Sequence, residues 1–223
     1  MRTCYACDAD PVTDEHAPPK CLFPESKDVE DGTDYRKNLI TVPSCATHNL
    51  RLSKDDEYFM VVCAVHFENN AVAVSHFDTK ILRALKRSPA FSAGILRDLR
   101  PATVLGQPSS AFTVDRRRIG DVLDKTGRAL SLHHLGRKQT RTSEVVAFAF
   151  GLDDEQTVPG LPFLEEAAAA LFAGAPKHGA NPDVFYYQIH GDRRGGVSFR
   201  LTFYGGFVAL VRFPDAHVGE GAV

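Results

Sequence analysis

Two pairs of metal-ligand residues near the start of the chain constrain its fold more than any other feature. Cys4 and Cys7 are separated by two residues, and so are Cys45 and His48. Each spacing allows a tight turn to direct both side chains toward one ion, and the two pairs together supply the four ligands of a tetrahedral zinc site. Four protein ligands close such a site, so we predict one structural Zn²⁺ that holds together a segment too polar to form its own core.

The overall composition is that of an ordinary globular protein. Of the 223 residues, 43% are hydrophobic and 24% are charged, which excludes a disordered, collagen-like or coiled-coil chain. No apolar run reaches the roughly 20 residues of a membrane span, and the first residues lack the apolar segment of a signal peptide. We therefore expect a soluble, cytoplasmic protein with no membrane partner, in which a reducing environment keeps the five cysteines unpaired.

The charges are distributed unevenly along the chain. Residues 80–141 contain 14 Lys and Arg against 4 Asp and Glu, a net charge of +10, although the whole chain has a net charge of -2. Such a block is typical of a surface that binds a polyanion such as nucleic acid. Within it, Arg116, Arg117 and Arg118 adjoin at the start of an expected helix, and we assign them to nucleic-acid binding. The alternative is a set of helices with solvated basic faces.

The hydrophobic periodicity predicts an α+β fold. Helices are expected over residues 53–65, 81–85, 88–99, 116–130 and 162–172. Strands are expected over residues 112–114, 145–150, 184–190, 197–204 and 207–213. Ser53 and Asp56 resemble a capping box, and Pro101 is expected to end the helix before it. The last three strands form an antiparallel meander with a two-residue turn at Gly205-Gly206 and one covering helix.

These patterns divide the chain into two parts. Residues 1–75 form a metal-held module, and residues 76–223 form an α+β domain that comprises a basic helical part, residues 80–141, and the meander, residues 184–213. The second domain carries no motif that assigns it a role. Target recognition, signal sensing and assembly into a homo-oligomer all stay open for it.

Further polar residues lie between and just after the two ligand pairs. Glu15 and His16 are adjacent, Asn38 precedes a β-prone run, and Asn49 directly follows His48. In these features residues 4 to about 60 resemble the HNH endonuclease family, whose ββα-metal site is often framed by two zinc knuckles. The resemblance implies an N-terminal ββα-metal (HNH) module that hydrolyses phosphodiester bonds of nucleic acid, DNA in preference to RNA.

The resemblance also assigns roles to single residues. His16 is the general base, because a neutral imidazole can take a proton from an attacking water. Asn38 holds the loop and this histidine in place. Glu15 and Asn49 bind one divalent cation, Mg²⁺ or Mn²⁺, which neutralises charge on the scissile phosphate and on the departing 3′ oxygen.

Three positions depart from the usual family pattern. His48 stands where a fourth zinc cysteine is usual, which predicts a Cys₃His site, and Asn49 stands where many members have their last histidine. Glu15 replaces the more frequent aspartate, and its longer side chain leaves Asp14 as a competing ligand. A second register, with Cys21 as the fourth zinc ligand and His48 on the catalytic metal, also stays open.

Two other functions are consistent with a cysteine- and histidine-rich N-terminal part. One is a zinc-structured nucleic-acid-binding module with an inactive nuclease site. The other, a zinc nucleobase deaminase, needs a glutamate two residues after its histidine, whereas His16 is followed by Ala17-Pro18. HNH domains joined to a second region resemble restriction or phage-defence effectors, which is an analogy of architecture.

Overall fold

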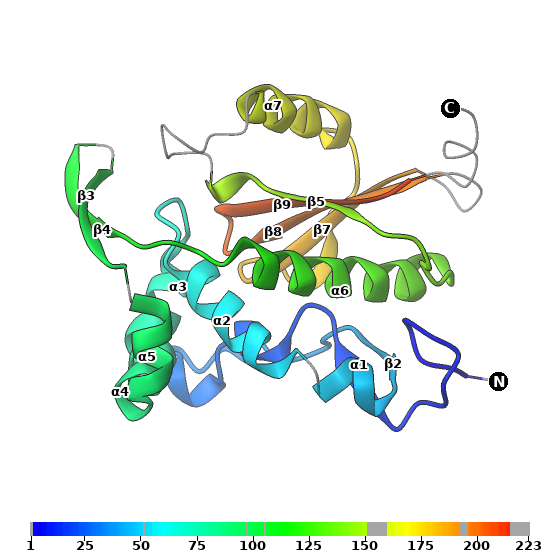
Figure 1. The fold of residues 1–223 in the computed structure, drawn as a ribbon, viewed down its shortest axis with the longest axis horizontal. Helices are drawn as coiled ribbons and strands as arrows, with labels where there is room; N and C mark the ends of the chain where they lie inside the picture. The colour runs from blue at the N-terminus through cyan, green and yellow to red at the C-terminus, as the bar shows by residue number, and fades with distance from the viewer. Residues whose placement is uncertain are drawn as a thin grey trace.

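The computed structural model describes residues 2–50, 52–96, 98–104, 106–150, 160–191 and 196–214. Helices and strands are both present, and an antiparallel sheet lies in the C-terminal half (Figure 1). The strands are β1 (Thr13–His16), β2 (Thr41–Ser44), β3 (Arg100–Val104), β4 (Gln107–Ala111), β5 (Glu144–Ala147), β6 (His178–Asn181), β7 (Phe185–Gly191), β8 (Val197–Phe203) and β9 (Phe207–Phe213). The α-helices are α1 (Ala46–Leu50), α2 (Ser53–Ala64), α3 (Ala71–His76), α4 (Leu82–Arg87), α5 (Pro89–Leu96), α6 (Arg116–Leu135) and α7 (Leu161–Phe172). This confirms the predicted α+β class.

The N-terminal part contains a small two-stranded sheet followed directly by two helices. β1 and β2 pair antiparallel, with Glu15 opposite Val42 and His16 opposite Thr41. The long connection between them, residues 17–40, contains two short 3₁₀ turns, and α1 and α2 follow β2. The N-terminal part thus consists of short strands, turns and helices, while residue 51, between α1 and α2, lies outside the described residues.

The start of α2 differs from the sequence prediction. Leu52 is the N-cap residue and makes no side-chain cap hydrogen bond. The carboxylate of Asp56 accepts hydrogen bonds from Lys125 instead, so the capping-box prediction was wrong. The carboxylate that a capping box would use thus forms a tertiary ion pair. Every residue from 58 to 64 is buried, whereas Val65, expected on the buried face, is 39% exposed.

A polar hairpin stands where the sequence predicted a longer helix and a later strand. α5 ends at Leu96 rather than Leu99, and Pro101 lies within β3, which pairs antiparallel with β4. Residues 112–114, expected as a strand, follow β4 without forming one. The sequence of β4, QPSSA, has no apolar alternation that could announce it. Proline is tolerated in β3 because both strands of an isolated hairpin are edge strands.

The C-terminal sheet has the strand order β5-β9-β8-β7-β6 and is antiparallel throughout. The predicted meander is confirmed as β7, β8 and β9, and the strand expected over residues 145–150 ends at Ala147. Between β8 and β9 the loop has three residues rather than two, because Phe203 pairs with Phe207. Tyr204 and Gly205 in that loop have φ angles of 49° and 76°.

Two helices cover this sheet, one on each face, where the sequence predicted one. α7 lies on one side of the sheet and α6 on the other (Figure 1). Side chains alternate along a strand, so Val208 and Leu210 of β9 share one face of the sheet. They pack there with Leu161 and Ala168 of α7. On the opposite face α6 approaches so closely that a Cβ at Gly127 would lie 2.7 Å from Val211 Cγ1. Only glycine allows this close approach.

One hydrophobic core joins the two predicted parts of the chain. It includes Cys4 and Val42 from the N-terminal part together with most of the inner face of the C-terminal sheet. Phe59 of α2 contacts Phe203 and Phe207 edge to face, with ring centroids 5.2 and 5.5 Å apart. The division at residue 75 stays a prediction, but the two parts share their packing. Among the described residues, no helix combines the length and the apolar character needed to cross a membrane.

A buried histidine ties α3 to this core. His76 is fully buried, and its Nδ1 lies 2.9 Å from the hydroxyl of Tyr204, which donates to the carbonyl of Leu22. Because Tyr204 has one hydroxyl proton, His76 Nδ1–H must be the donor to Tyr204. The other nitrogen, Nε2, then has no proton and no partner in the described part of the chain. The imidazole is therefore neutral.

This arrangement predicts a loss of stability in mild acid. Burial, with the positive charges of Lys80 and Arg36, lowers the pKa of His76 to about 3, so the unfolded chain takes up a proton below about pH 6.5 and the folded chain does not. Between pH 7 and pH 5 the free energy of unfolding should fall by about 2 kcal/mol more in the wild type than in His76→Gln. Chemical denaturation of both proteins at each pH measures this difference, and parallel pH curves would contradict it.

Candidate metal centre and active site

Cys4, Cys7, Cys45 and His48 form a compact cluster whose ligand atoms all lie within 4.8 Å of one another. A tetrahedral zinc site with metal–sulfur distances of about 2.3 Å has sulfur–sulfur edges of roughly 3.8 Å. The Sγ atoms of Cys7 and Cys45 are 3.9 Å apart. His48 Nδ1 lies 3.5, 3.6 and 3.2 Å from the Sγ atoms of Cys4, Cys7 and Cys45. The Cys₃His donor set therefore fits a structural zinc ion.

Backbone hydrogen bonds bring the two ligand pairs together. Tyr5 N–H donates to the carbonyl of Pro43, which fixes the first pair against β2. Burial acts to raise the pKa of the Cys4 thiol, but hydrogen bonds with the backbone of Ala6, Cys45 and Cys7 outweigh it and lower that pKa to about 6. At pH 7 this cysteine is mostly the thiolate, which is the form that binds metal.

Cys21, the fourth zinc ligand of the alternative register, lies outside the cluster. Its Sγ donates to the carbonyl of Asp56 at 3.4 Å, and burial raises the pKa of its thiol to about 12. Such a thiol stays protonated and is a poor metal ligand. The structure thus favours the register in which His48 completes the zinc site. Cys63 is fully buried in the core, as expected for an unpaired cysteine.

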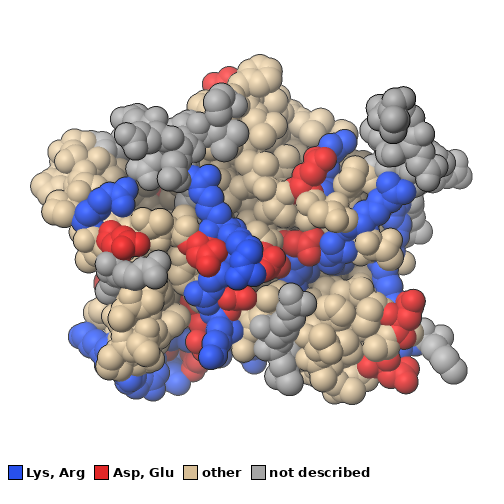
Figure 2. Space-filling model, in the orientation of Figure 1, with Lys and Arg blue, Asp and Glu red and all other residues tan. Residues whose placement is uncertain are grey.

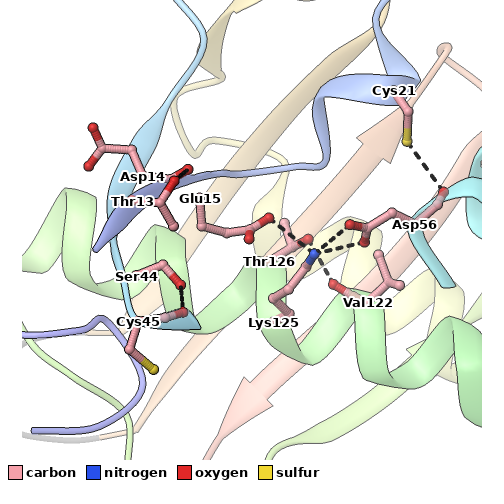
Figure 3. A network of polar contacts seen from close by, with 10 residues as sticks. All are labelled: Thr13, Asp14, Glu15, Cys21, Ser44, Cys45, Asp56, Val122, Lys125 and Thr126. Atoms are coloured by element: carbon pink, nitrogen blue, oxygen red, sulfur yellow. Dashed lines mark hydrogen bonds and ion pairs between the residues drawn. The ribbon is translucent and has the colours of Figure 1, made fainter. Parts of the chain in front are cut away.

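Glu15 and His16, adjacent on β1, have different surroundings. Glu15 is only 5% exposed, whereas His16 is half-buried, as expected when successive side chains point to opposite faces of a strand. Burial lowers the pKa of the His16 imidazole, and the positive charge of Lys20 lowers it further. His16 is therefore neutral at pH 7. Asp14 points away from Glu15 (Figure 3) and pairs with Arg2 at 3.2 Å.

Glu15 takes part in a buried ion cluster that the sequence did not reveal. Lys125 Nζ, from α6, lies 3.1 Å from Glu15 Oε1 and 2.7 and 2.9 Å from the two carboxylate oxygens of Asp56 (Figure 3). Burial raises the pKa of both carboxyls, and Lys125 acts against that rise. The second oxygen of Glu15, Oε2, is buried and has no hydrogen-bond partner among the described residues.

The two asparagines assigned from the resemblance lie on either side of β2 in the sequence, one in the loop before it and one in α1. Asn38 is exposed, three residues before β2, with a left-handed φ of 55°, a conformation that asparagine tolerates better than most residues. Nearby, Ala17 N–H donates to the carbonyl of Ile40, which closes the loop after His16. Asn49 is half-buried in α1, and no hydrogen bond joins its side chain to Glu15 in the described part of the chain.

The three adjacent arginines at the start of α6 differ in their contacts and exposure. Asp115 caps the helix by accepting from the backbone N–H groups of Arg117 and Arg118. Arg118 also donates to Asp55 at 2.5 Å and lies 4.2 Å above the ring of Tyr58, so it joins α6 to α2. Arg116 is exposed, and the side chain of Arg117 is 79% exposed. Figure 2 shows Lys and Arg side chains across the face that α6 crosses, with Asp and Glu among them.

Comparison with known proteins adds no assignment. No protein-family model, no curated protein and no solved structure matches this chain. Function must therefore be inferred from the geometry described above together with the resemblance carried by residues 4–60.

Lys125 and Asp56 are the residues at this site that sequence reasoning missed. One local clue was available for Lys125. It lies three residues after Val122 and four before Ala129 on the buried face of α6, in an apolar stripe where a lysine is out of place. A charged residue there needs a buried partner. The sequence could have indicated that Lys125 has a buried partner, but it could not have identified that partner as Glu15.

Proposed function

We propose that this protein is a metal-dependent endonuclease of the HNH type that hydrolyses phosphodiester bonds in nucleic acid, with DNA as the preferred substrate. One observation carries the proposal. A two-stranded sheet, β1 and β2, leads directly into α1, the Cys₃His cluster frames the three elements, and the strand β1 ends in Glu15-His16. This is the order of elements and side chains that the resemblance implies.

His16 would act as the general base. A proton acceptor must be neutral at the working pH and accessible to water, and His16 meets both conditions because it is half-buried and its pKa is lowered. In the proposed step its imidazole takes a proton from the attacking water. The oxygen of that water then forms a bond to phosphorus while the bond to the 3′ oxygen breaks, and the departing 3′ oxygen takes a proton from solvent to become a hydroxyl. Lys20, which lies close enough to lower the pKa of His16, adds a positive charge beside the phosphate.

Glu15 and Asn49 would hold the divalent cation. Mg²⁺ and Mn²⁺ prefer oxygen ligands, and the buried, unpartnered Oε2 of Glu15 fits that preference. When bound, the cation supplies neutralisation of charge on the scissile phosphate and the departing oxygen. Asn38, in its left-handed conformation, would keep the loop after His16 in place.

The exposed arginines of α6 would contact phosphates. Arg118 is part-buried, bound to Asp55 and packed on Tyr58. The contacts are therefore expected from the more exposed Arg116 and Arg117, the second of which pairs with Asp121 at 3.7 Å on the surface. A variant with both replaced by alanine should bind duplex DNA more weakly, and the slope of log affinity against log salt should fall by about 0.9 for each lost contact.

A matched control separates this effect from loss of net charge. Lys177→Ala with Arg212→Ala removes two exposed positive charges outside residues 80–141. Fluorescence anisotropy at four salt concentrations measures each slope. Equal slopes for the wild type and the Arg116/Arg117 variant would assign these arginines to a solvated face.

One observation favours the alternative of a nucleic-acid-binding module with an inactive nuclease site. Glu15 is bound to a lysine rather than left free for a metal ion. Incubation of the purified protein with plasmid DNA and with RNA, each in Mg²⁺, Mn²⁺ and EDTA, decides between the two. The endonuclease should convert supercoiled plasmid to nicked or linear forms only with a divalent cation. Binding without any cleavage would favour the alternative.

A further inference from the structure

We infer that Lys125 is a positioning residue for Glu15: its ammonium group holds one carboxylate oxygen so that the other is presented to a divalent cation. The inference rests on the proposed function. It also means that α6, outside the segment resembling HNH endonucleases, completes the metal site. The N-terminal part would then not bind the cation with full affinity by itself.

The contacts of Lys125 leave it little freedom. Its side chain is 3% exposed, and its three N–H donors match three acceptors, the two oxygens of Asp56 and Oε1 of Glu15. Asp56, from α2, therefore anchors the ammonium group by two contacts, and the third reaches Glu15. Three elements that are distant in sequence, β1, α2 and α6, meet at this nitrogen (Figure 3).

This geometry fixes the orientation of the Glu15 carboxylate. A carboxylate held at Oε1 cannot rotate without losing that hydrogen bond, so the direction of Oε2 is fixed as well. Outer partners that orient a metal ligand typically change metal affinity by about 10- to 100-fold when they are removed. The buried Oε2 atom also has no hydrogen-bond partner among the described residues, which is costly unless a ligand binds there.

A second lysine provides a control for loss of a bridge between the two parts of the chain. Lys138 Nζ contacts Thr3 Oγ1 at 2.6 Å, the carbonyl of Cys7 at 2.5 Å and Asp8 Oδ1 at 3.1 Å. It joins the end of α6 to the N-terminal part as Lys125 does, but it does not contact Glu15. If Lys125 only held the two parts of the chain together, replacing either lysine should change the affinity for Mn²⁺ by a similar factor.

The test measures the affinity of zinc-saturated full-length protein for Mn²⁺. Electron paramagnetic resonance detects the Mn²⁺ that stays free in solution during the titration. Lys125→Met should weaken binding by at least tenfold, and Lys138→Met should leave it within twofold of the wild type. Because Lys125→Met alone leaves two buried carboxylates without a cation, the double variant Lys125→Met/Asp56→Asn is included. The double variant removes the negative charge of Asp56 together with the positive charge of Lys125. We expect it to fold and to retain zinc, and to bind Mn²⁺ as weakly as Lys125→Met does.

The outcomes separate this inference from the proposed function. Wild-type affinity for Mn²⁺ in the folded double variant, tighter binding in either Lys125 variant, or no binding beyond zinc in the wild type would each overturn the inference. A wild type that binds Mn²⁺ in a Lys125-dependent manner but cleaves no nucleic acid would uphold the positioning role and contradict the nuclease.

Discussion

Replacing Cys45 with serine should release the bound zinc and unfold the N-terminal part of the chain. Cys45 is 8% exposed and lies within the cluster that joins the first residues to the start of α1. Structural zinc in small modules contributes an apparent binding free energy of about 10–16 kcal/mol, far more than the few short strands of residues 1–48 can replace. Metal analysis should find one zinc per wild-type chain and almost none in Cys45→Ser, whose thermal unfolding should begin at a lower temperature.

Cys21→Ser is the matched control, since Cys21 is a neighbouring cysteine outside the cluster. It should retain one zinc per chain. Full zinc content in Cys45→Ser would contradict the Cys₃His site, and loss of zinc in Cys21→Ser would restore the register in which Cys21 is the fourth ligand.

Replacing His16 with alanine should reduce metal-dependent cleavage by about 10²- to 10⁴-fold, the usual contribution of general acid–base catalysis. DNA affinity, zinc content and thermal stability should change little, because the half-buried imidazole makes no hydrogen bond to another described residue. Initial rates at saturating DNA for wild type and variant measure the effect.

His133→Ala controls for removal of a histidine elsewhere, since His133 is exposed on α6. Its cleavage rate should equal that of the wild type. A loss of less than tenfold in His16→Ala would show that another group removes the proton from water.

Short-range patterns made much of the fold predictable. The four zinc ligands are recognisable from two local spacings, and the meander from dense aromatic and β-branched residues over β7, β8 and β9. α6 was recognisable from its apolar period: it begins at Arg116, as predicted, and ends at Leu135, beyond the predicted end at Leu130. The Asp115 cap and the left-handed Gly136 set those limits.

The remaining features depend on contacts distant in sequence or on weak local patterns. β6, with the sequence HGAN, contains no β-branched or aromatic strand former and pairs only because β7 offers an edge. The ion cluster joins Lys125 to Glu15 and Asp56, which precede it by 110 and 69 residues. No periodicity or spacing rule reaches over such a separation. The charge pattern of residues 80–141 therefore indicated only a basic surface, although Lys125 within that block is buried.

The most direct measurement of the central claim is the chemistry of the cleaved ends. Hydrolysis that breaks the bond to the 3′ oxygen leaves a 5′ phosphate and a 3′ hydroxyl, which DNA ligase can rejoin. Plasmid nicked by the wild type in Mg²⁺ should be resealed by ligase. No nicks should form in EDTA, and His16→Ala should form them at least about 100-fold more slowly. Nicks that form equally in EDTA or with His16→Ala, or no nicks at any Mg²⁺ concentration, would contradict a metal-dependent nuclease centred on His16.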